Sequence, residues 1–354
     1  METGRQYRHS TELELPLQAR SKFTKPPSMF SGPAAFLFLV VLLTFATPSF
    51  SSPGLLLTEH FDDSSFASRG WYDTDATVSS VSTVEKYAGA GSYSCAFGVG
   101  ATGCTGGTPK RYLITPSEEL YITYYVKRSS NWTGSGSIDH PHIFYILSDL
   151  DGNYDGPAVN YLTTYIEENW GAAGTTGVFR VSTQDSKNIP GYQVQTPSPL
   201  QNRVGVTENR DVSGCSGRLI PDSPSSVECY WASPTWRNGK RYDSSAVFTS
   251  GNKSAWHKVT THLKMNSISN GIAVADGKAE LWLDDVLQYS NTNVAYRTGQ
   301  HPTMKWKQFV LSPYIGVGSP VAQTIWIDEL NISDSPPGTS IKYPQPPVIR
   351  GVIP

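Results

Sequence analysis

The sequence has few charged residues and lacks the signatures of several functional classes. Charged residues make up only 16% of the chain, and 28 Lys and Arg against 30 Asp and Glu leave a formal net charge of -2. This balance excludes a basic protein that coats nucleic acid and an acidic disordered tail. The chain also lacks a glycine-rich phosphate loop, a nucleophile elbow and, after residue 51, any long hydrophobic pattern of helical period. We therefore expect no nucleic-acid partner and no organic cofactor.

The composition is that of a folded β-protein. With 38% hydrophobic and 12% aromatic residues the chain can bury a core, and 31 Gly and 25 Pro supply many turns. Short segments rich in Tyr, Thr, Val, Ile and Trp alternate with turn residues, which is typical of a sandwich or a barrel. The segments predicted as strands are residues 120–127, 142–147, 159–167, 178–184, 256–265, 279–284, 307–311 and 324–332.

The N-terminal region predicts export. Residues 34–46 read AAFLFLVVLLTFA, follow several Arg and Lys residues and precede small and turn residues. At about 1.5 Å per residue this segment is too short for a bilayer core of roughly 30 Å, which favours a cleaved secretory signal. Cleavage is expected near Ser49 to Ser52, while an uncleaved anchor and a true start at Met29 remain alternatives.

The N-terminal segment sets the expected domain organisation and cellular location. Residues 1–51 form the N-terminal polar region and signal peptide or anchor, residues 52–334 form one domain, and residues 335–354 form a proline-rich tail. We expect a secreted or extracellular protein, with the periplasm or the cell surface as alternatives. The mature domain would contact no membrane unless the anchor is retained.

Export makes disulfides the expected state of the four cysteines, since thiols in an oxidising compartment normally pair. Near-neighbour pairing predicts bridges from Cys95 to Cys104 and from Cys215 to Cys229, one of three possible connectivities. A four-cysteine zinc site is the alternative, but the close C-x-x-C pairs that it needs are not present.

Alternation along the strands predicts a second face that is both aromatic and polar. Residues two apart share one side of a strand, so Ile166 and Phe309 mark the buried side. Sugars bind to surfaces that combine stacking rings with hydrogen-bonding groups. In the alternative, the tyrosines form a minor core covered by loops. The open positions predicted to line one groove are Tyr125, Lys127, His142, Tyr161, Tyr165, Arg180 and Gln308.

The stretch from Trp256 carries a family resemblance. It has a Trp that opens a strand, a K-x-N at the strand's end, an Asn-Gly turn, and Asp276-Gly277 before a strand that ends in W-x-D. Together with IWIDELNIS and LLLTEHFDD, it is similar to concanavalin-like jelly-roll proteins, especially polysaccharide lyases of the alginate, glucuronan and heparin lyase kind. The matched pieces cover about a third of the chain. The resemblance implies an all-β, two-sheet antiparallel β-sandwich and a polysaccharide partner.

The activity that the resemblance implies is β-elimination in an acidic, uronate-containing polysaccharide. The Q-x-H and Y-x-K-x-G-x-Y-x-Q motifs of known lyase subfamilies are absent as written. The resemblance therefore supports the fold more strongly than the activity. A retaining glycosidase is disfavoured, because the closest acids, Glu280 with Asp284 and Asp328 with Glu329, lack the spacing of its acid pair. The alternatives are a carbohydrate-binding or adhesive module without catalysis and a structural surface protein.

A lyase needs a carboxylate-binding group, a base and a proton donor. We assign His142 as the base, Tyr161 or Tyr165 as the donor, and Arg180 or Gln308 as the uronate-binding group. A structural or metal-binding role is the alternative for His142, which lies in an H-x-H sequence. The remaining substrate-binding candidates are Tyr125, Lys127, Tyr145 and Tyr314.

A structural calcium ion is expected between the terminal strands, because many jelly rolls hold one there with oxygen ligands. The resemblance assigns Glu59 and Asp328 to this site. The run Asp149, Asp151, Asn153 and Asp155 has the alternating spacing of a calcium loop, and an acidic β-turn is its alternative.

Overall fold

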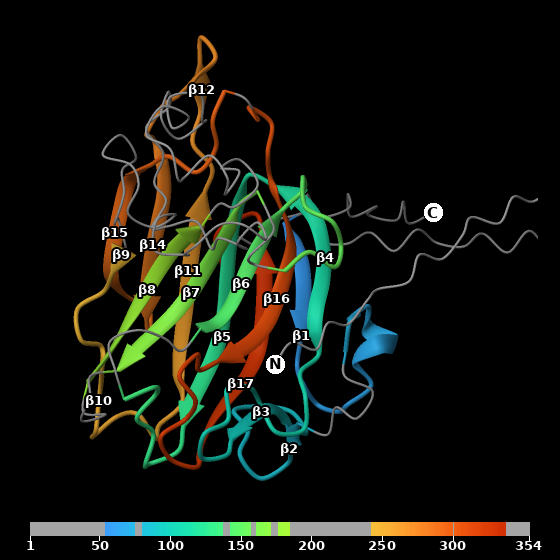
Figure 1. The fold of residues 1–354 in the computed structure, drawn as a ribbon, viewed down its shortest axis with the longest axis vertical. Helices are drawn as coiled ribbons and strands as arrows, with labels where there is room; N and C mark the ends of the chain where they lie inside the picture. The colour runs from blue at the N-terminus through green and yellow to red at the C-terminus, as the bar shows by residue number, and fades with distance from the viewer. Residues whose placement is uncertain are drawn as a thin grey trace, which may run out of the picture. The chain divides into compact units, whose positions relative to one another are not determined.

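The computed structural model describes residues 54–74, 80–136, 142–156, 161–170, 176–184, 242–299 and 301–337. The chain divides into two compact units, Met1–Ser49 and Phe50–Pro354, and all described residues belong to the second unit. Figure 1 shows two β-sheets packed face to face, as the sequence predicts. The one helical turn among the described residues is η1 (Phe66–Arg69). None of these residues lies in a helix long and apolar enough to cross a membrane.

The first sheet, sheet A, has the strand order β15-β14-β11-β5-β17-β3-β2, with β1 beside β17. Its strands are β1 (Leu55–Glu59), β2 (Val81–Ser82), β3 (Ser92–Phe97), β5 (Glu119–Arg128), β11 (His257–Lys264), β14 (Gly277–Leu283), β15 (Val286–Val294) and β17 (Gln323–Ser333). Every pairing in it is antiparallel.

The second sheet, sheet B, has the order β10-β8-β7-β6-β16-β4, with β9 beside β8. Its strands are β4 (Lys110–Ser117), β6 (His142–Ser148), β7 (Thr163–Trp170), β8 (Thr176–Gln184), β9 (Tyr242–Asp243), β10 (Phe248–Thr249) and β16 (Trp306–Tyr314). A separate hairpin joins β12 (Ile268–Ser269) to β13 (Ile272–Ala273) through the predicted Asn-Gly turn. Each of the eight segments predicted from the sequence overlaps a strand of sheet A or sheet B.

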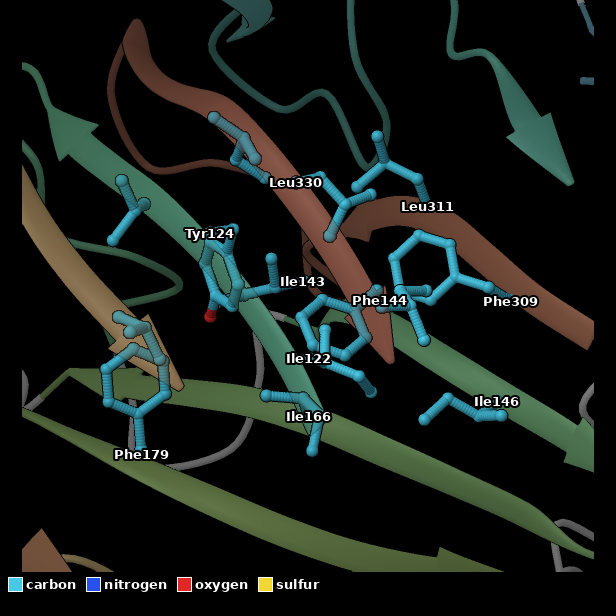
Figure 2. Close-up of a cluster of buried hydrophobic side chains, with 14 of the residues drawn as sticks. Ile122, Tyr124, Ile143, Phe144, Ile146, Ile166, Phe179, Phe309, Leu311 and Leu330 are labelled. Atoms are coloured by element: carbon cyan, nitrogen blue, oxygen red, sulfur yellow. The ribbon is translucent and has the colours of Figure 1, made fainter. Parts of the chain in front are cut away.

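Apolar side chains from both sheets meet in one core, part of which is drawn in Figure 2. The ring of Tyr124 on β5 packs edge-on against Phe144 on β6, with centroids 5.5 Å apart, and so joins the two sheets. Burial alternates along β5, because Ile122, Tyr124 and Val126 face the core while Tyr121 and Tyr125 face outward. The period of two that predicted these strands therefore also sorts their faces correctly.

A fully buried ion pair also joins the sheets. Arg128, at the end of β5, and Glu168, on β7, have no exposed side-chain surface. The Nε atom of Arg128 donates to Oε2 of Glu168 at 2.8 Å. The guanidinium also lies over the ring of Phe248, 3.8 Å from its centroid. Burial raises the pKa of Glu168 despite the neighbouring guanidinium.

The disulfide between Cys95 and Cys104 is present, as predicted, and no free cysteine occurs among the described residues. It ties β3 to the loop that follows this strand. The predicted pair Cys215 and Cys229, the signal segment and most of the proline-rich tail lie outside the described residues.

Candidate active site

The outer face of sheet B carries a polar and aromatic row across four strands. Its cross-strand partners, in order, are Tyr314 of β16, His142 of β6, Glu167 of β7 and Arg180 of β8. The ring of His142 stacks on that of Tyr165, with centroids 4.3 Å apart, and its Nδ1 atom lies 3.2 Å from Oε1 of Glu167. The row therefore brings an imidazole, a carboxylate and phenols into contact, with a guanidinium directly across from the carboxylate.

A β-bulge places His142 on this face. Phe144 and Ile146 point into the core, so strict alternation would direct His142 inward as well. The register shifts between His142 and Phe144, and the extra residue returns the imidazole to the outer side beside Tyr165. Bulges often re-aim a side chain in this way.

A second row lies beside the first on the same face. Its cross-strand partners are Arg111 of β4, Val310 of β16, Tyr145 of β6, Tyr165 of β7 and Ser182 of β8. Tyr145 and Tyr165 join Leu147 and Val310 in an apolar cluster that is separate from the main core. The two rings are 8% and 4% exposed, which agrees with the alternative in which the tyrosines form a minor core.

Arg111 is a central residue that the sequence analysis missed. Its Nε atom donates to Oδ2 of Asp73 at 2.8 Å, and its Nη1 atom donates to the carbonyl of Asp155 at 3.0 Å and to Oε1 of Gln308. Because Oε1 of Gln308 accepts from Arg111, the Nε2 group of this amide is left as a donor. The alternation in KRYLITPS, with Tyr112 and Ile114 against the core, could have identified Arg111 as outward-facing.

The phenol of Tyr145 is kept in its protonated form. Burial raises its pKa, and the charge of Asp73 adds to this effect while Arg111 opposes it. A protonated phenol can donate to an oxygen in the same row.

Asn169 extends the face beyond Glu167, two residues further along β7. Its side chain is buried, and neither amide atom has a hydrogen-bond partner. Buried side-chain amides are normally hydrogen-bonded, so Asn169 is an exception on this face.

Tyr161 does not join these rows. It precedes β7, packs against the main core and lies 5.2 Å from the ring of His301. Its backbone N–H donates to Oδ1 of Asp151 at 2.7 Å.

The prediction that Tyr125 and Lys127 line the same groove as His142 is wrong. Both residues lie on β5 and face outward from sheet A, whereas His142 faces outward from sheet B. Alternation separates the inner side of a strand from its outer side but does not specify the sheet to which the strand belongs. The predicted groove therefore combines residues from the outer faces of two different sheets.

The two acids assigned to calcium are engaged elsewhere. Glu59 accepts hydrogen bonds from the backbone N–H of Phe61, from Nε of Arg69 and from Nε1 of Trp71. Asp328 accepts from three backbone N–H groups, those of Tyr87, Ala88 and Glu329. Carboxylate oxygens that face donor groups in this way do not fit a shared cation. The calcium ion remains a prediction without geometric support.

The run from Asp149 to Asp155 forms an acidic turn, which is the alternative to a calcium loop. Asp151 accepts from the backbone and hydroxyl of Ser148, and Asp155 accepts from the backbone of Gly152. Within the part of the chain that the structure describes, no group of three or more His, Cys, Asp or Glu side chains could hold a metal ion.

Solved structures that match this chain include alginate lyases and a glucuronan lyase. An alginate lyase mutant in complex with alginate trisaccharide matches with a TM-score of 0.46 and 15% identity, covering 81% of this chain and all of that one. The alginate lyase from Chlorella virus matches with a TM-score of 0.47 and 11% identity, covering 76% and 95%. The endo-β-1,4-glucuronan lyase of the fungus Trichoderma reesei matches with a TM-score of 0.41 and 13% identity, covering 75% and 92%.

Matches at these TM-scores and identities assign no role to any residue of this chain. No protein-family model matches the sequence, and no curated protein matches it.

Proposed function

We propose that the protein is a secreted lyase that cleaves an acidic, uronate-containing polysaccharide by β-elimination on the outer face of sheet B. The observation that carries this proposal is the stack of His142 on Tyr165, next to the Glu167 carboxylate and on the same face as the Arg111–Gln308 pair. These groups supply a base, a proton donor and a binding group for the carboxylate of the sugar, the three components that the reaction needs.

Different residues of this face bind the substrate, take the proton and donate a proton. Arg111 and the Nε2 group of Gln308 bind the uronate carboxylate and make the neighbouring C–H more acidic. His142 takes that proton, and the electron pair of the C–H bond forms a carbon–carbon double bond as the glycosidic C–O bond breaks. Tyr165 or Tyr145 gives its proton to the leaving oxygen. Glu167 then stabilises the cationic imidazole at 3.2 Å.

Three residues position the chain of sugars around this step. Arg180, directly across from Glu167, offers a positive charge for a further uronate, and the unpaired amide of Asn169 offers a donor and an acceptor. Tyr314 is 43% exposed, and its ring centroid lies 6.3 Å from that of His142, so it provides a ring at the other end of the row.

The Cys95–Cys104 bridge agrees with an exported protein, since disulfides persist in oxidising compartments.

The proposal is tested by incubating the purified protein with alginate, glucuronan, heparin and a neutral glucan and following the absorbance of unsaturated sugar ends. We expect absorbance with at least one polyuronate and none with the neutral glucan. His142→Ala should lower turnover by about 10²-fold or more, because positioned proton transfer is commonly worth 10²–10⁴. Tyr125→Phe, on the outer face of the other sheet, is the matched control and should turn over normally. Binding of a polyuronate without unsaturated ends would instead identify a carbohydrate-binding module.

A further inference from the structure

The outer face of sheet A carries the described tryptophans that lie outside the core. Of the seven tryptophans among the described residues, four are buried in the core. The other three, Trp256, Trp282 and Trp326, are each only partly buried. Trp282 and Trp326 alternate with core residues on β14 and β17, which places both rings on the outer side of sheet A. Trp256 directly precedes β11 of the same sheet.

The rings on this face form two groups. In the first, Tyr121 stacks on His262 with centroids 4.1 Å apart, and His262 lies 6.4 Å from Trp282. These three residues come from β5, β11 and β14, so the group crosses three neighbouring strands.

The second group lies further along the same strands. Tyr87 stacks on Tyr125 with centroids 3.5 Å apart and meets the edge of Trp256 at 6.2 Å. Trp326 is the cross-strand partner of Lys127, two residues beyond Tyr125. Diagonal neighbours of this kind lie about 7–8 Å apart in a sheet, so Trp326 continues the second group onto β17.

Hydroxyl groups occupy the space between the two ring groups. Thr123 and Thr260 are cross-strand partners on β5 and β11, and their hydroxyls lie 3.0 Å apart. They separate the row of Tyr121 from the row of Tyr125. The face thus has rings at both ends and hydrogen-bonding groups in the middle.

Carboxylates compensate three lysines of this face. Lys127 pairs with Glu85 at 2.6 Å, Lys258 with Asp285 at 2.7 Å, and Lys264 with Glu119 at 3.1 Å. His262 also contacts two carboxylates, because its ring nitrogens lie 2.6 Å from Glu280 and 2.8 Å from Glu119. With these three lysines paired to carboxylates, the face offers a polyanion little electrostatic attraction.

We propose that the outer face of sheet A is a second carbohydrate-binding surface, and that its ligand is an extended neutral polysaccharide. The partly exposed rings stack against the apolar faces of sugar units, and the carboxylates and threonines between them accept and donate hydrogen bonds to sugar hydroxyls. The charge compensation selects a neutral chain over a uronate chain. The surface lies on the opposite side of the sandwich from His142, so one molecule can hold a neutral polymer while its other face works on an acidic one.

The test is a depletion assay of the full protein on insoluble cellulose, xylan, mannan and chitin, with immobilised alginate for comparison. We expect retention on at least one neutral polymer. Trp326→Ala and Trp282→Ala should each weaken that retention about 10-fold, because one stacking platform is lost. Val317→Ala is the control for lost apolar surface, since Val317 is 73% exposed in the loop before β17 and belongs to neither ring group. Circular dichroism and the melting temperature confirm that each variant folds.

The readout is binding, so the test is independent of lyase activity. Retention on no neutral polymer would overturn the proposal, as would equal retention of the wild type and both tryptophan variants. A wild-type dimer that dissociates in the tryptophan variants would show that a second copy of the chain covers this face, and would overturn it as well.

Discussion

The Nδ1 atom of His142 lies 3.2 Å from Oε1 of Glu167, on the neighbouring strand of sheet B. Both side chains are about nine-tenths buried, which strengthens their electrostatic interaction relative to water. A carboxylate in this position orients the imidazole and stabilises its cationic form. The pair gives the proposed base a fixed geometry.

Glu167→Gln should therefore lower kcat on a polyuronate by about tenfold or more while KM changes little, because the charge acts mainly after proton transfer. Steady-state kinetics of the variant measure both constants. Glu85→Gln, which removes the carboxylate that pairs with Lys127 of sheet A, serves as the control. Unchanged kcat in Glu167→Gln would contradict a role for this carboxylate in the reaction.

The Arg128–Glu168 pair predicts a strong dependence between two substitutions. Glu168→Gln alone should lower the free energy of unfolding by about 3–5 kcal/mol, because it leaves the fully buried Arg128 charge without its partner. The double variant Arg128→Met with Glu168→Leu should recover most of this loss, since apolar side chains can replace a buried pair. Chemical denaturation of the single and double variants gives the values. A double variant no more stable than Glu168→Gln would show that the pair does not behave in this way.

The carboxylates on either side of His262 predict a loss of stability in acid. Burial tends to raise the pKa of Glu119 and Glu280, but hydrogen bonds from Lys264 and His262 to Glu119, and from His262 and Ser290 to Glu280, outweigh it and lower both. A lowered folded-state pKa contributes stability that is complete above the unfolded-state pKa and is lost as the pH falls through the folded-state value.

The melting temperature should accordingly fall on acidification below about pH 4.5, and the fall should be smaller in the double variant Glu119→Gln with Glu280→Gln. Thermal melts over a pH series check this. An equal fall in the wild type and the double variant would contradict the linkage.

The disulfide between Cys95 and Cys104 closes a short loop, with a sequence separation of 9. Replacing both cysteines by Ala should lower the free energy of unfolding by about 2–3 kcal/mol, as expected for loop closure of this length. Denaturation of the variant measures the loss, and peptide mapping without reduction identifies the bridge. The same map tests the predicted bridge from Cys215 to Cys229. Crossed pairs would contradict both assignments.

The sequence predicts the strands and their faces well because both depend on local alternation. Alternation assigns Ile166 and Phe309 to the core from their own strands alone, and the structure places both there. Edge strands were harder to predict. Burial along β15 does not follow a period of two, since both sides of this strand are largely exposed.

The composition of the candidate site could not be predicted in this way, because it depends on pairing between distant segments. β5 pairs with β11 and β17, far along the chain, so Tyr125 faces away from His142 although the two are close in sequence. Arg111 reaches Gln308 only because β4 pairs with β16. The bulge at His142 is likewise invisible to a strict alternation pattern.

Elimination and hydrolysis leave different ends on the oligosaccharides that the outer face of sheet B would release from a polyuronate. The most direct measurement is mass spectrometry of the oligosaccharides that the wild-type protein releases from a polyuronate in heavy-oxygen water. We expect unsaturated ends that carry no oxygen from the solvent, and none of these products with His142→Ala. Saturated ends that contain solvent oxygen, or equal release by the wild type and His142→Ala, would contradict the proposal.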